Sequence, residues 1–163
     1  MRVIDGGRFD QPLPVQVNKI FVEGNFDLVI TPGQVVPHEV MGLSNYTKNI
    51  GVGLGGHDTI HHSHFLVAVC YMETIMSRVE TRGLHAMVEA CNRFISHRLP
   101  VLCILTVMQD TAKRSPLRGL YPGHARSGYE AAGRLSATVT ITLVDRPIDR
   151  CVLWQDPREF QIN

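Results

Sequence analysis

The sequence predicts an α/β fold with a largely parallel sheet flanked by helices, formed by a single domain that spans residues 1–163. Apolar runs with the composition of strands alternate along the chain with longer helical segments, which is the pattern of β-α-β units. A chain of 163 residues, 44% of them apolar, is long enough to bury a core of its own. The formal net charge of +1 is typical of a globular protein and not of a disordered chain.

The first half of the chain predicts two helices and one strand. VNKIFVEGNF at residues 17–26 indicates a short helix that ends at its glycine, and FDLVITPG at 26–33 indicates a buried strand that runs into a turn. The Pro, Gly, Ser and Asn content of residues 35–49 predicts irregular chain, which the glycine run at 51–56 extends. HFLVAVCYMETIMSR at 64–78 is apolar on nearly all sides, so we expect a buried helix there.

The second half continues the alternation. RGLHAMVEACNRFISHR at residues 82–98 predicts an amphipathic helix, and the β-branched run PVLCILTVMQD at 100–110 predicts a central strand with neighbours on both faces. SPLRGLYPG at 115–123 is expected to be a loop that leads to a helix at 124–136. Two further strand-like runs follow, at residues 137–145 and 149–156.

Composition excludes several classes of protein. The basic residues are scattered and no aromatic and arginine motif interleaves them, so we expect no nucleic-acid partner. No window approaches the roughly 18 apolar residues of a membrane span, and the first ten residues lack the apolar segment of a signal peptide. The four cysteines are far apart, which is typical of reduced thiols. We therefore expect a soluble, cytoplasmic protein.

Two side chains in the region 35–49 are candidates for chemistry. Ligands of open α/β sheets bind beyond the carboxyl ends of strands, which is where the strand at 26–33 delivers Gln34 and His38. His38 is a candidate general base because imidazole titrates near neutrality; a turn histidine bonded to backbone is the alternative. Lys48 precedes an apolar, glycine-rich run, and partial burial would make its amine a nucleophile or a covalent anchor. An ordinary surface lysine is the alternative.

The segment GGHDTIHHSH at residues 55–64 contains four of the eight histidines of the chain. If it is helical, His57, His61 and His64 share a face, and such a group suits zinc, nickel or copper. Ser63 is a good N-cap for the helix that follows, which would place His64 in its first turn, where the helix dipole keeps imidazole neutral. His64 is therefore the best single metal-ligand candidate. His62 points elsewhere.

The glycine run GVGLGG has a second interpretation. Its backbone could approach an anion at the start of the following helix, although it lacks the lysine spacing of a phosphate-binding loop. Three functional hypotheses thus follow from the residues: an enzyme domain, a metal-binding module that uses the histidine cluster, and a nucleotide-binding α/β module that uses the glycine run.

Several motifs together resemble a known family. The order P-H-E-V-x-G, N-Y-T-K-N, G-x-G-G-x-D-T-I and S-H-F is similar to the signature region of the nickel-pincer-dependent lactate racemase (LarA-like) family of 2-hydroxy acid racemases and epimerases. The motifs GQVVPHEV and NYTKN resemble those of a sugar-acid branch of this family, that of D-mannonate epimerase. The similarity extends from about residue 17 to the last predicted strand, and DPREF at 156–160 resembles the entrance to the second domain of that family's two-domain architecture.

The resemblance implies a role for particular residues. Lys48 would form the covalent link to the nickel pincer nucleotide (pyridinium-3,5-bisthiocarboxylic acid mononucleotide), and His64 would be the protein ligand to nickel. His38 would be one of the acid/base histidines that act on the substrate hydroxyl while the cofactor ring takes the hydride from C2. Gly53, Gly55 and Gly56 would contact the cofactor.

The resemblance also implies that the chain is a part of a larger active site. Family members are much longer, and no histidine precedes His38 to serve as the second acid/base group. We therefore expect missing sequence or a partner chain to complete the site for a small 2-hydroxy acid or sugar-acid substrate. His57, His61 or His62 are alternatives for that second group.

Overall fold

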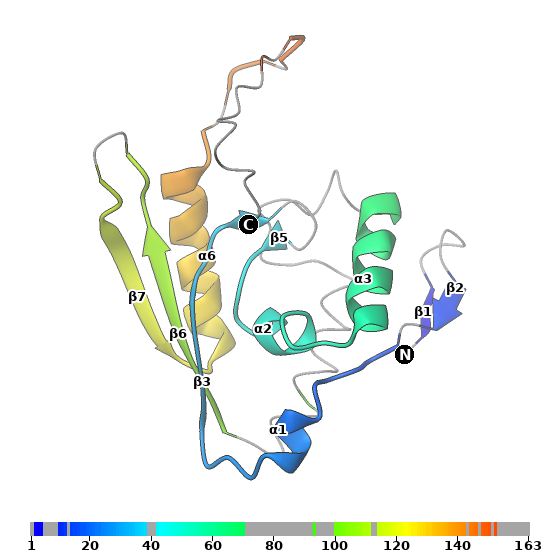
Figure 1. Cartoon of the computed structure of the whole chain (residues 1–163). Helices are drawn as coiled ribbons and strands as arrows, with labels where there is room; N and C mark the ends of the chain where they lie inside the picture. Colours follow the sequence, from blue (N-terminus) through cyan, green and yellow to red (C-terminus); the bar gives the residue numbers. More distant parts are fainter. Residues whose placement is uncertain are drawn as a thin grey trace, which may run out of the picture.

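The computed structural model of the chain describes residues 2–4, 10–12, 14–38, 42–70, 93, 100–111, 114–142, 144–146, 148–150 and 152 (Figure 1). Within them lie a three-stranded sheet, two small strand pairs and four helices, so the α/β fold class predicted from the sequence is confirmed. No helix in this described part is both long enough and apolar enough to cross a membrane.

The main sheet has the order β3-β6-β7, formed by β3 (Val29–Gln34), β6 (Val101–Met108) and β7 (Leu117–Gly123). The central position predicted for the run at 100–110 is confirmed. β3 pairs with β6 in parallel and β7 pairs with β6 antiparallel, so the described sheet is mixed and not largely parallel. The difference arises because residues 115–123, expected to be a loop, form β7. Proline and glycine are tolerated in β7 because it lies at an edge of the sheet that the described residues form.

β3 is less buried than its apolar sequence suggests. Thr31 is buried while Ile30 is 53% exposed, so only one face of the strand is covered. β3 lies at the other edge of the described sheet, a position that accepts Pro32 without losing a bond inside the ladder. The predicted burial of this strand therefore holds for one face only, whereas its position and its parallel pairing are as expected.

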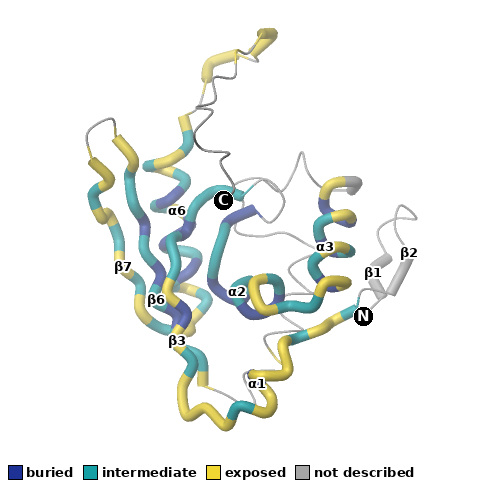
Figure 2. The backbone as a smooth tube through the Cα atoms, viewed as in Figure 1, coloured by how far each residue is buried: buried dark blue, intermediate teal, exposed yellow. Residues whose placement is uncertain are grey.

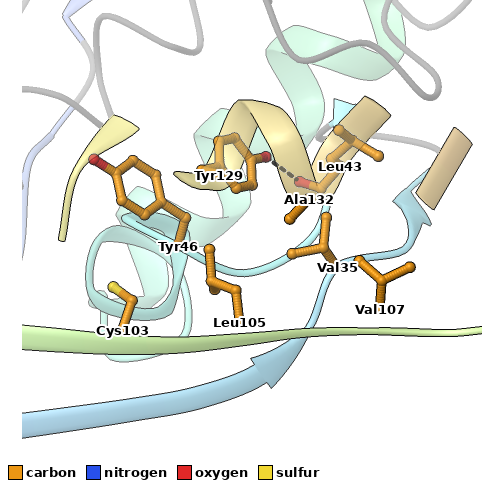
Figure 3. Packing of buried hydrophobic residues seen from close by; sticks show 8 residues of the cluster. All are labelled: Val35, Leu43, Tyr46, Cys103, Leu105, Val107, Tyr129 and Ala132. Atoms are coloured by element: carbon orange, nitrogen blue, oxygen red, sulfur yellow. Dashed lines mark hydrogen bonds between the residues drawn. The ribbon is translucent and has the colours of Figure 1, made fainter. Parts of the chain in front are cut away.

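One helix covers one face of this sheet. α6 (Arg126–Thr140) packs against β6 and β7, and their contact forms the main core (Figures 1 and 3). The buried members of this core are Val35, Leu43, Tyr46, Cys103, Leu105, Val107, Tyr129 and Ala132. In β6 the buried residues alternate with less buried ones, as the two-residue period of a strand requires (Figure 2).

The end of α6 corrects another prediction. Residues 137–140, expected to begin a strand, continue the helix, because Ala132, Ser136 and Val139 recur at helical spacing on the face that meets the core. The remainder of the two strand-like runs, as far as the structure describes it, contains no strand. Of the helix predicted at 82–98, only Arg93 is described, and it is helical; the rest lies outside the described residues.

The elements before and after β3 are short. β1 (Arg2–Ile4) and β2 (Asp10–Pro12) form an antiparallel pair, and α1 (Ile20–Glu23) ends at Gly24 as predicted. The region expected to be irregular contains a small hairpin of β4 (Pro37–His38) and β5 (Gly42–Leu43), followed by α2 (Lys48–Gly51). α3 (His57–Cys70) then begins seven residues before the predicted helix at 64–78. The hairpin, α2 and α3 together carry the predicted site residues.

Candidate functional site

A cavity of about 210 Å³ lies between the hairpin, α2 and α3. His38 enters it from β4, Lys48 from the start of α2 and His64 from α3, so the three side chains singled out from the sequence line the same space. The remaining lining residues are Ser44, Asn45, Asn49, Val52 and Gly53. Three elements and the loop before α2 thus bring two histidines, one lysine and two asparagines to the lining of one cavity.

Lys48 has an unusual environment for a lysine. Burial lowers the pKa of its amine from 10.5 to about 7, because the charged form loses hydration in the cavity wall. A substantial share of the amine is therefore neutral near pH 7, and only the neutral form is nucleophilic. Lys48 is thus partly buried, which is the condition on which the sequence interpretation of its amine as a nucleophile or covalent anchor depends.

The loop before Lys48 is held by its neighbours. Asn45 and Tyr46 both adopt left-handed backbone conformations, with φ of 66° and 63°, which cost of order 1 kcal/mol or more for residues other than glycine. The Asn45 carboxamide offsets this cost by donating to the Gln34 carbonyl at the end of β3 and to Ser44 Oγ, 3.2 Å away. It lies directly over Gly33, where a Cβ atom would collide with it.

Ser44 completes this attachment. Its hydroxyl donates to the Gln34 carbonyl (2.7 Å) and accepts from the Val36 amide (2.9 Å). The loop is therefore fastened to the carboxyl end of β3, where ligands of α/β sheets are expected to bind. The sequence interpretation did not include Ser44, Asn45 or Asn49 among the candidates. Their polar side chains on both sides of Lys48 were the available signal.

His64 lies in the second turn of α3, and the predicted reason for its position is wrong. Ser63 is not an N-cap, because α3 begins at His57 and Ser63 is buried inside the helix with its hydroxyl donating to the Ile60 carbonyl, 2.8 Å away. The argument from the helix dipole therefore does not apply to His64. The neighbouring backbone fixes its tautomer instead: Nδ1 lies 2.8 Å from the Ile60 carbonyl, which can only accept, so Nδ1 carries the hydrogen. Nε2 is then the ring nitrogen that remains for a metal ion.

The other histidines of α3 lie apart from the cavity lining. The rings of His57 and His61 stack with centroids 5.8 Å apart, and the His57 side chain is 88% exposed beside Asp58. Within the described residues, no group of three or more His, Cys, Asp and Glu side chains is arranged to hold a metal ion. The expected helical face of His57, His61 and His64 thus exists, but it forms no metal cage.

The glycine run is used mainly for packing. The backbone amides of Gly51, Val52, Gly53, Gly55 and Gly56 donate to carbonyls of the chain itself, so they do not form an anion cradle. Of the glycines in the run, only Gly53 lines the cavity, next to Val52. Gly55 pairs with Val17, and a Cβ atom at Gly56 would collide with Gln16, so these two glycines serve a close approach of the N-terminal segment.

Comparison with known proteins gives two matches. Residues 3–75 match the family model described as the lactate racemase N-terminal domain, a region that contains His38, Lys48 and His64. The fold is similar to the crystal structure of a Thermotoga maritima protein, with a TM-score of 0.75 and 21% sequence identity over 88% of this chain. The chain spans 35% of the length of that protein. No curated protein matches the sequence.

Proposed function

We propose that the chain is the cofactor-bearing domain of a racemase or epimerase that acts on 2-hydroxy acids with a nickel pincer nucleotide. The observation that carries the proposal is the convergence of His38, Lys48 and His64 on one cavity. The match of residues 3–75 to the lactate racemase N-terminal domain supports it independently. The substrate is a small 2-hydroxy acid or a sugar acid. The motifs of this sequence resemble those of the branch that contains sugar-acid epimerases.

The donor set of the cavity fits such a cofactor. An amine whose pKa is about 7 is suited to a covalent bond with a carbonyl-type carbon, because it is nucleophilic at neutral pH. An imidazole whose Nδ1 hydrogen is held by a backbone carbonyl leaves Nε2 as its ligand atom, and imidazole nitrogen is a favourable ligand for nickel. A single histidine ligand needs no cluster of metal-binding side chains.

Each residue then has one task. Lys48 holds the nucleotide through its amine, and His64 ligates nickel through Nε2. His38 removes the proton from the substrate hydroxyl oxygen and returns it, as a general acid/base group does. When bound, the nickel pincer nucleotide supplies a reversible acceptor for the hydride of C2. The second acid/base group, and the residues that select the substrate, are supplied by parts of the protein outside the lining of this cavity or by a partner chain.

Intact mass measurement tests the proposal. The chain is co-expressed with the enzymes that make the pincer nucleotide; the wild type should gain the mass of the nucleotide less that of the group released in the condensation, and Lys48→Ala should not. Lys19→Ala is the matched control, because Lys19 is an exposed lysine outside the cavity. His64→Ala should keep the adduct and lose nickel, measured by elemental analysis. An unmodified wild type, or an adduct that survives Lys48→Ala, would refute the proposal.

A further inference from the structure

Two buried tyrosines connect the loop before Lys48 to α6. The rings of Tyr46 and Tyr129 stack with centroids 4.8 Å apart and an angle of 14° between their planes (Figure 3). The Tyr129 hydroxyl donates to the Leu43 carbonyl, 3.2 Å away, and the Tyr46 hydroxyl donates to the His124 carbonyl, 3.0 Å away. Each tyrosine thus donates to a backbone carbonyl that lies a few residues before the other tyrosine in the chain.

These contacts are made by residues on either side of a segment that lines the cavity. Leu43 and Tyr46 lie on either side of Ser44 and Asn45, which line the cavity. Two residues after Tyr46 comes Lys48, and the Tyr46 carbonyl accepts the Asn49 amide, 3.1 Å away, at the start of α2. A helix of four residues cannot define its own position, because isolated helices of this length are unstable. The position of α2 therefore depends on the contacts of the loop before it.

Ordinary core packing does not account for the hydroxyl groups. Tyr129 is 6% exposed, and phenylalanine would fill the same volume without a buried polar atom. Burial raises the pKa of Tyr129, so its hydroxyl remains protonated and able to donate to Leu43. The polar end of this side chain is aimed at the loop, and this indicates a role beyond filling the core.

We propose that Tyr129 is a positioning residue for Lys48: through its bond to Leu43 and its stack on Tyr46 it fixes the loop against α6 and sets how deeply Lys48 enters the cavity. Tyr129 lies outside residues 3–75, which match the family model, so that match assigns it no role. The inference rests on the proposed function for the importance of Lys48, but its test needs no cofactor. Its failure is therefore distinguishable from failure of the proposed function.

The test measures the pH dependence of amine labelling at Lys48. The full chain is treated with a trace of acetic anhydride at several pH values, and acetylation of Lys48 is quantified by peptide mass spectrometry relative to Lys19. Tyr129→Leu, which removes both the stack and the bond, should raise the labelling midpoint of Lys48 by at least one pH unit. Such a rise lowers the labelling rate at pH 7 by about fivefold, because the neutral fraction falls from about one half to about one tenth. Tyr129→Phe, which removes only the bond, should raise the midpoint by less.

Tyr121 provides the matched control. It packs against the same core from β7, and we therefore expect Tyr121→Leu to cost stability without moving the Lys48 midpoint. A merely structural role for Tyr129 would lower the melting temperature and leave the midpoint of the folded protein unchanged, and that result would overturn the proposal. If Tyr129→Leu does not fold, Tyr129→Phe decides: a midpoint equal to that of the wild type refutes the inference.

Discussion

Replacing Lys48 with methionine should change how the stability of the protein depends on pH. Methionine has nearly the length of lysine and no charge, so the substitution removes the buried amine with little change of volume. In the wild type, burial lowers the pKa of the amine from 10.5 in its ordinary state to about 7 in the folded chain. The folded protein therefore releases this proton at a lower pH than the unfolded chain does.

The sign and the magnitude follow from proton linkage. Between pH 7 and 10.5 the unfolded chain binds the proton and the folded chain does not, so the free energy of unfolding rises with pH by at most 1.36 kcal/mol per unit. Integrated from pH 7 to 9, the gain is about 2 kcal/mol. Because the Lys48 side chain is only partly buried, screening by water reduces this to about 1 kcal/mol. Below pH 7 both states bind the proton and the gain is absent.

Urea unfolding followed by circular dichroism measures the effect. The free energy of unfolding of Lys48→Met should exceed that of the wild type at pH 6 and pH 7, and the difference should shrink by about 1 kcal/mol at pH 9. Lys19→Met, which replaces an exposed lysine, should keep the pH dependence of the wild type. A difference between Lys48→Met and wild type that stays constant from pH 6 to 9 would show that the amine is not buried as described.

Two further predictions concern stability at fixed pH, measured by urea unfolding. Gly33→Ala should destabilise the protein by about 1–3 kcal/mol, because the new Cβ collides with the Asn45 carboxamide. Gly128→Ala, inside α6 with nothing within 4 Å of the added atom, should instead stabilise it by up to about 1 kcal/mol; equal effects of the two would contradict the reasoning. Leu105→Ala should lower the free energy of unfolding by about 2–5 kcal/mol, because the side chain is 2% exposed. Leu120→Ala, at a position 55% exposed, should change it by no more than about 0.5 kcal/mol. A loss of the same size at both positions would be evidence against this core.

The sequence alone was sufficient for features whose signal is local. The β-branched, apolar composition of residues 100–110 predicted β6, and the helix predicted at 124–136 covers most of α6. His38, Lys48 and His64 could be selected as candidates because all three lie within 27 residues, in the stretch whose motifs resemble the lactate racemase family. Their placement around one cavity is consistent with that selection, whereas their chemical roles stay predictions.

Features that depend on distant partners could not be found in this way. Residues 115–123 carry the proline and glycine of a loop and become β7 only because β6 offers them an edge to pair with. The beginning of α3 and the end of α6 were also misplaced, because their polar or β-branched sequences are ambiguous without the surfaces on which they pack.

The sequence by itself thus determined which side chains are available near one strand end, since their types and spacing are written in one short stretch. Only the tertiary structure decided the burial, the pKa and the hydrogen bonds of these side chains. The lowered pKa of Lys48 comes from its burial in the folded chain. The tautomer of His64 comes from a carbonyl one turn earlier in α3, and the loop before Lys48 is held by Tyr129, which is 86 residues from its partner Leu43. Burial and hydrogen-bond geometry are properties of the assembled chain, and no local pattern of residues specifies them.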